Sequence, residues 1–193
     1  MAELRRRVPE SNEVPLLDDT QQNAVLDEFR RQARAARRQT QLIIGPLGTA
    51  LCLAYFYFAI QALLDPWSVR HHAELIDVLR PVAIAAGEAI SGVAMAGSLA
   101  AVIANCRLRP ALGRSILQSS VLTTILVSLF WSMALAKMLR LHSYELDGAW
   151  RVFWLPLAPA VWSLICVSLI NTIQCVQADL RRLRAARYRL HSA

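Results

Sequence analysis

The sequence predicts an all-α, polytopic membrane protein with four transmembrane helices and a basic amphipathic helix flanking them at each terminus. The chain has 193 residues, of which 55% are hydrophobic and only 18% are charged. Roughly 25% of residues are charged in an average soluble domain. A soluble core of this size cannot bury so many apolar side chains, so we expect the excess to face lipid.

Four segments are long and apolar enough to cross a hydrocarbon core of about 30 Å, which takes roughly 20 helical residues. They extend over residues 42–64, 82–104, 116–139 and 152–175. The helices of a soluble bundle would carry polar stripes of Lys, Glu and Arg along their length. The only charged residues inside the four segments are Glu88 and Lys137, so we expect helices that span a membrane.

The segment before the first span divides into two parts. Residues 1–17 show no hydrophobic periodicity and contain two prolines, which predicts a disordered segment. Residues 18–41 begin with Asp19 and Gln22 at the spacing of a capping box. Apolar residues then recur at steps of three and four, which predicts an amphipathic helix. Its opposite face is basic and is expected to bind lipid or a partner through Arg30, Arg31, Arg34, Arg37 and Arg38.

The segment after the fourth span, residues 177–193, has a similar composition. Leu180, Leu183 and Leu190 alternate with arginines, which predicts a basic helical tail. Its candidate lipid- or partner-binding residues are Arg181, Arg182, Arg184 and Arg187. Three interpretations of the two basic helices stay open. They can lie on an anionic cytoplasmic leaflet, they can pack on each other or on a partner protein, or their arginines can simply fix the topology.

The distribution of basic residues predicts the orientation. Sixteen of the 21 Lys and Arg residues lie in the N-terminal segment, in the loop between the second and third spans, and in the tail. Cytoplasmic loops carry such an excess, so both termini are predicted to be cytoplasmic. The endoplasmic reticulum is the first expectation for the membrane, although a bacterial inner membrane fits the same rule.

The second span places an acid, Glu88, among small apolar residues. With cytoplasmic termini, this acid lies about six residues below the outer boundary. Ser132 of the third span lies at a similar depth, and Lys137 lies about one turn above it. An acid at such depth is expected to face the helix bundle. We therefore predict an intramembrane polar cluster of Glu88, Ser128, Ser132 and Lys137 that clasps the helices together. The alternative is a protonation site in a transport path.

The faces of the second and third spans predict how they pack. The second span presents a seam of Gly, Ala and Ser at helical spacing, and small residues let membrane helices approach closely. The third span offers a ladder of hydroxyls at four-residue steps, namely Ser120, Thr124, Ser128 and Ser132. These features predict contact between the two spans, with the second span as the central helix.

The first loop contains three possible metal ligands, His71, His72 and Glu74. Adjacent histidines on a helix point in different directions, and no second cluster supports them, so the sequence predicts no metal site. It favours a short amphipathic helix on the outer surface. The side chains expected to face inward are Trp67, Leu75, Ile76 and Leu79. The cysteines lie within or at the ends of the apolar segments, so no intramolecular disulfide is expected.

The sequence contains no catalytic motif, no cofactor-binding motif and no signature of a nucleic-acid-binding protein. The leading hypothesis is a non-enzymatic subunit, adaptor or assembly factor of a membrane complex, bound to anionic lipid and to a protein partner or a second copy of the chain. The alternative is a small transporter or channel subunit that uses Glu88 as a proton or cation site. A lipid-modifying enzyme is the least supported hypothesis.

Overall fold

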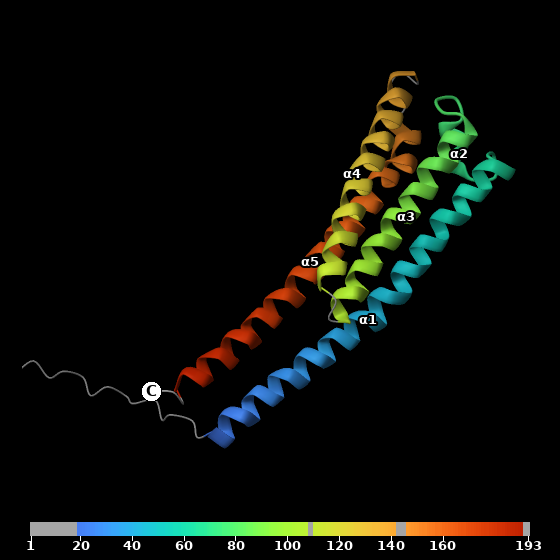
Figure 1. Ribbon diagram of the computed structural model, residues 1–193. Helices are drawn as coiled ribbons and strands as arrows, with labels where there is room; N and C mark the ends of the chain where they lie inside the picture. Colours follow the sequence, from blue (N-terminus) through green and yellow to red (C-terminus); the bar gives the residue numbers. More distant parts are fainter. Residues whose placement is uncertain (1–18, 108–109, 142–145, 191–193) are drawn as a thin grey trace, which may run out of the picture.

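The computed structural model describes residues 19–107, 110–141 and 146–190 (Figure 1). Over these residues the chain is helical, with no strands. The elements are α1 (Asp19–Leu64), α2 (Arg70–Leu75), α3 (Pro81–Cys106), α4 (Pro110–Leu141) and α5 (Leu146–Leu190). The expected disorder of residues 1–17 falls on a segment outside the described residues.

Four of these helices, α1, α3, α4 and α5, are long and apolar enough to cross a membrane, which confirms the predicted number of spans. Large apolar side chains on their outer faces are more than half exposed. A soluble protein rarely exposes so continuous an apolar surface, so this surface is suited to lipid. Representative residues of the surface are Leu53, Tyr57, Leu122, Leu126, Met133 and Leu164.

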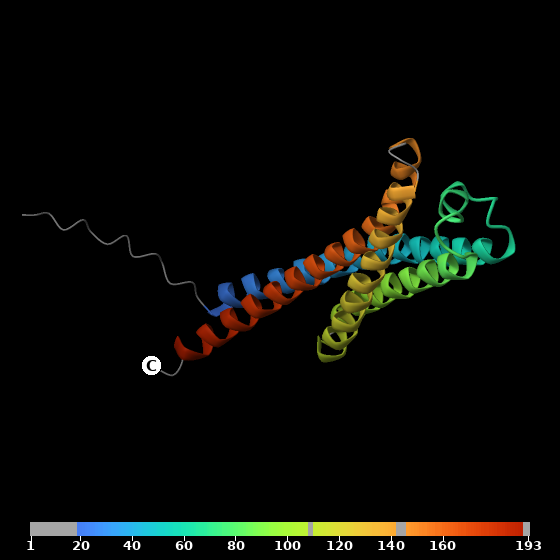
Figure 2. The ribbon, with the colours of Figure 1, turned by 90° about the horizontal axis from the view of Figure 1, so that it is seen from above.

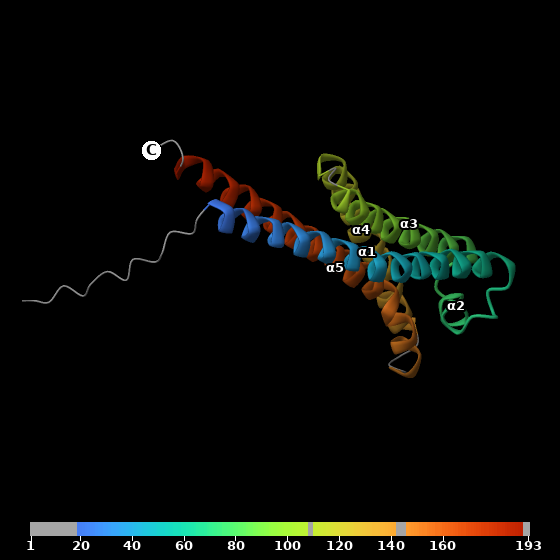
Figure 3. The same ribbon diagram turned by 90° about the horizontal axis from the view of Figure 1, so that it is seen from below.

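The predicted N-terminal amphipathic helix is not a separate element, because α1 continues through it into the first span without interruption. No Gly or Pro occurs between Asp19 and Gly45, so nothing in the sequence stops the helix there. The tail is likewise the end of α5. We call residues 19–41 the N-terminal arm and residues 177–190 the C-terminal arm. The arms run side by side beyond the ends of α3 and α4 (Figures 1, 2 and 3).

Helix α3 is the centre of the bundle, as the sequence predicted, and it contacts α1, α4 and α5. Half of the most apolar 18-residue stretch of α3 is buried, compared with 22% of the corresponding stretch of α1. Its small residues form the buried seam, which consists of Gly87, Ser91, Ala94, Ser98, Ala101 and Asn105. Neighbouring helices can approach this seam because its side chains are short.

A buried hydroxyl network joins α3, α4 and α5. Ser98 on α3 lies 2.7 Å from Ser120 on α4 and 3.2 Å from Ser163 on α5, measured between hydroxyl oxygens. Thr124 completes the network at 2.8 Å from Ser163. Ser120 also donates to the carbonyl of Ala94. The expected contact between the second and third spans is therefore confirmed, and its hydroxyls bond between helices.

Candidate functional site

The candidate site lies at the end of the bundle where α1 meets α3, which we call the loop end. Helix α1 ends at Leu64, just before Asp65 and Pro66, and α3 begins at Pro81, a residue suited to the first turn of a helix. The loop between them contains α2 and folds back against the bundle (Figures 1 and 3). Leu75 of α2 is fully buried as predicted, whereas Trp67 is 66% exposed.

The two adjacent histidines of α2 both reach Glu88 on α3. The Nε2 atoms of His71 and His72 lie 2.8 and 3.0 Å from the same carboxylate oxygen, Oε1 of Glu88. Glu88 and His72 are completely buried, and His71 is 7% exposed. We call these three residues the His–His–Glu cluster. Their possible ligand atoms all lie within 4.8 Å of one another.

Aromatic rings enclose this cluster. The ring of His71 lies 5.1 Å from Phe58 on α1 and 5.1 Å from Trp154 on α5, between centroids, with both rings in edge-to-face orientation. Tyr55 of α1 is buried and lies within electrostatic range of Glu88. The apolar walls hold the imidazoles in place and keep water from the carboxylate, so polar interactions in the cluster are stronger than they would be in water.

Three buried polar atoms around the cluster have no hydrogen-bond partner in the described residues. They are Oε2 of Glu88, Nδ1 of His72 and the hydroxyl of Tyr55. A buried polar group without a partner costs about 1–3 kcal/mol, and in most proteins nearly every such group is paired. The concentration of such atoms at one place therefore distinguishes this site from the rest of the bundle, where the hydroxyl network satisfies its members.

Two further contacts tie the loop to the bundle. Lys137 on α4 donates to the carbonyl of Val78 at 3.1 Å, and Arg151 on α5 forms an ion pair with Glu74 at 3.1 Å. Both are partly exposed, so each contributes little stability by itself. Together with Glu88, these residues connect the loop to three helices.

The predicted polar cluster of Glu88, Ser128, Ser132 and Lys137 does not form as expected. Ser128 donates to the carbonyl of Pro156, Ser132 donates to Ser128 within its own helix, and Lys137 bonds the loop. Glu88 is inside the bundle as predicted, but its partners come from α2. The physical reason is that the loop folds into the bundle, so the imidazoles reach the acid before any side chain of α4 or α5.

The sequence predicted no metal site at the histidines because adjacent side chains on a helix diverge, and this premise is wrong. In the structure both imidazoles converge on Glu88, and Glu74 pairs with Arg151 instead. A sequence signal was nevertheless available, because Glu88, the only acid in the four predicted spans, follows the His71–His72 pair by 16 residues.

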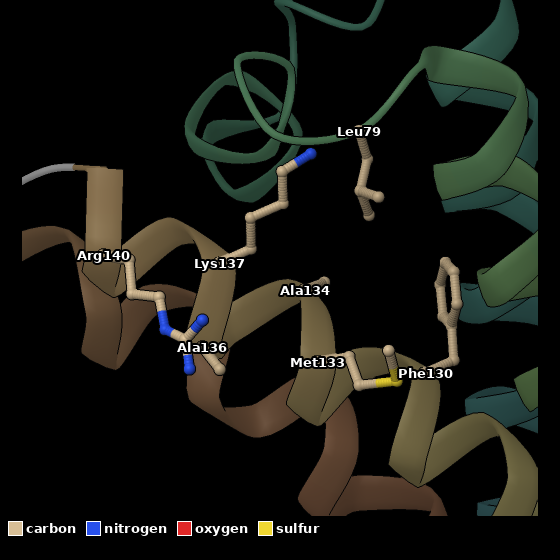
Figure 4. A pocket seen from close by; sticks show the side chains of 7 residues that line it. All are labelled: Leu79, Phe130, Met133, Ala134, Ala136, Lys137 and Arg140. Carbon is tan, nitrogen blue, oxygen red and sulfur yellow. The ribbon is translucent and has the colours of Figure 1, made fainter.

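A pocket of about 480 Å³ lies between α4 and the loop residue Leu79. In Figure 4 the Lys137 amine points toward the loop segment before Leu79, while the Arg140 side chain points away from it. Met133 and Phe130 form the apolar part of the wall. The pocket is therefore cationic at one end and apolar at the other.

The predicted lipid- or partner-binding arginines lie on the two arms. Arg31, Arg34, Arg38, Arg181 and Arg182 are exposed, and Arg30 and Arg37 are half-buried. The side chains of Arg184 and Arg187 are outside the described residues. Part of the apolar face of the N-terminal arm is exposed, since Phe29 is 49% exposed.

Comparisons of the chain with protein-family models, with curated proteins and with solved structures find no significant match.

Proposed function

We propose that this protein is a non-enzymatic subunit, adaptor or assembly factor of a membrane complex, and that its two arms are the contact surfaces. The observation that carries the proposal is the geometry of α1 and α5. Each is a single helix that spans the bundle and continues beyond the ends of α3 and α4 (Figure 1). A rigid, basic and partly apolar projection on a transmembrane helix is suited to binding rather than to chemistry.

Distances along α1 divide its arginines into two groups. Arg38 lies about 6 Å beyond Leu42, the first residue of the apolar segment, at 1.5 Å per residue. This distance is within the polar layer of a bilayer, which is about 5–8 Å thick on each side. Arg31 lies about 16 Å beyond Leu42. Since the Debye length in cells is about 8 Å, lipid charge is largely screened there. A tilted helix shortens both distances but keeps their order.

The proximal residues Arg37 and Arg38 therefore contact anionic lipid headgroups, and the distal residues Arg30 and Arg31 contact a protein partner. The exposed ring of Phe29, next to the distal pair, supplies the apolar part of that interface. Interfaces are enriched in Arg and aromatic residues, which supports this assignment. The proposed partner is another membrane-complex subunit or a second copy of this chain, and the proposal includes no nucleic acid as a partner.

The proposal includes cytoplasmic termini. It rests on the excess of basic residues in both arms and in the α3–α4 loop. The endoplasmic reticulum is the first membrane to test. Cysteine accessibility in intact and permeabilised vesicles measures the topology. Labelling of residues from the two arms on opposite sides of the membrane contradicts it.

The second candidate is a small transporter or channel subunit in which Glu88 binds a cation. The burial of this acid with two imidazoles favours it, because ionisable groups inside a bundle often mark an ion path. We place it second since the carboxylate is completely enclosed near one end of the bundle. Cation flux into liposomes that is lost in a folded Glu88→Gln variant would reverse this order.

The decisive experiment compares two double variants of the full-length protein, purified from native membranes in mild detergent. The distal variant is Arg30→Gln with Arg31→Gln, and the matched proximal variant is Arg37→Gln with Arg38→Gln. We expect wild type and the proximal variant to retain a stoichiometric partner, and the distal variant to lose it. Equal retention by both variants, or no stoichiometric partner in wild type, would refute the assignment.

A further inference from the structure

We propose that the His–His–Glu cluster binds one divalent transition-metal ion, with zinc as the ion that suits it best. This inference does not depend on the proposed function of the arms. Two imidazole nitrogens and one carboxylate oxygen are a ligand set that zinc uses when its fourth position is left open to a small ligand. Imidazole also distinguishes such an ion from Mg²⁺ and Ca²⁺, which take oxygen ligands.

The distances between the ligand atoms fit this assignment. Zinc–nitrogen and zinc–oxygen bonds are about 2.0–2.1 Å, so two ligands of a tetrahedral site lie about 3.3 Å apart. The Nε2 atoms of His71 and His72 are 2.8 and 3.0 Å from Oε1 of Glu88. These two contacts are a few tenths of an ångström shorter than in a tetrahedral site. All three ligand atoms lie within 4.8 Å of one another, so binding an ion requires the two imidazoles to turn about it as well.

The unpartnered atoms are the second and independent observation. Oε2 of Glu88 is buried without a partner beside the two imidazoles, so the carboxylate has a free oxygen for a bound ion or for its remaining ligand. The hydroxyl of Tyr55, on α1, is also buried without a partner. These two oxygens lie on two different helices, α3 and α1. The site therefore has polar atoms that remain available after its three members have bonded to one another.

The surroundings orient the ligands and limit access. Phe58 and Trp154 contact the ring of His71 edge-on, and an apolar shell of this kind controls solvent access to metal sites. His71, at 7% exposure, is the only member of the cluster with a residual opening to the outside. An ion therefore reaches the site from the loop rather than through the bundle.

The position of the ligands gives the ion a structural role. Helix α2 has six residues, too few to be stable by itself, and two of them are ligands. The third ligand lies on the central helix. A bound ion thus attaches the loop to α3, and its binding energy adds to the stability of the folded bundle.

The test uses full-length protein without a polyhistidine tag, in mild detergent, stripped with EDTA and titrated with Zn²⁺ alone by calorimetry. We expect one saturable equivalent and a zinc-dependent rise in Tm. His71→Ala and Glu88→Gln should weaken binding by more than about 100-fold, since loss of even an outer-shell partner costs 10–100-fold. The matched control Glu74→Gln removes an acid of the same loop that is outside the cluster, and it should bind zinc like wild type.

Co²⁺ provides a second readout, because a four-coordinate site gives it a strong visible absorption. If Glu88→Gln does not fold, the comparison of His71→Ala with Glu74→Gln decides the question, since His71 lies at the rim of the site. Absence of saturable binding in wild type would overturn the proposal. Equal binding by His71→Ala and Glu74→Gln would also overturn it, because the ion would then be held elsewhere.

Discussion

The close contact between α3 and α4 offers a sharp test, because two glycines of α3 differ in what surrounds them. A Cβ atom at Gly87 would lie 2.7 Å from ring carbons of both Phe130 and Trp131 on α4. A Cβ atom at Gly92, five residues further along, would meet the ring of Phe56 at 3.4 Å, an ordinary contact. We therefore expect Gly87→Ala to destabilise the protein relative to Gly92→Ala.

The magnitude follows from two opposing effects. Ala is more favourable than Gly inside a helix by about 0.8–1.0 kcal/mol, and both variants gain this amount. Overpacking costs about 1–3 kcal/mol, and only Gly87→Ala incurs it. Trp131 is 1% exposed and donates to Ser91 at 3.2 Å, so it cannot move away without losing a hydrogen bond. The two variants should thus differ by about 1–3 kcal/mol, or roughly 5- to 150-fold in the unfolding equilibrium.

Reversible unfolding by SDS in mixed micelles, followed by circular dichroism, measures this difference. Both variants replace Gly with Ala in the same helix, so the contribution of helix propensity cancels in the difference between their stabilities. Equal midpoints for Gly87→Ala and Gly92→Ala would refute the close approach of α3 and α4. A Gly92→Ala variant less stable than Gly87→Ala would refute the helix rotation that places Gly87 against α4.

Three other predictions concern separate contacts. Ser163→Ala should destabilise the protein by about 0.5–1.5 kcal/mol, since it removes the member of the hydroxyl network that α5 contributes. The control Thr172→Ala removes only a bond within its own helix and should cost less. Equal costs for the two variants would mean that the network adds no stability. Arg151→Gln should change stability by at most about 1 kcal/mol, because the side chains of the ion pair, Arg151 and Glu74, are 39% and 32% exposed. A larger loss in the same SDS assay would show that the pair is desolvated. Electrophoresis of the full-length protein with and without reductant should give one mobility, and a shift that disappears in a Cys106→Ser or Cys175→Ser variant would reveal a disulfide.

The sequence was sufficient for features that depend on composition along a single helix. The four spans are visible because lipid requires about 20 apolar residues in succession, whatever their neighbours are. The central position of α3 was predictable for a related reason. Its small residues recur at helical spacing, and only close helix contact makes use of such a seam. The orientation in the membrane and the binding role of the arms stay predictions.

Only the tertiary structure decided which polar groups meet. The sequence placed Glu88 inside the bundle correctly, but it paired the acid with Ser132 or Lys137 because both lie within about one turn of its depth. Depth along a helix says nothing about how far a connecting loop folds inward. Because α2 packs against α3 and α5, His71 and His72 reach the acid, while Ser132 and Lys137 bond elsewhere. The pairing depends on helix rotation and on the path of the loop, and both are determined by packing among all the helices at once.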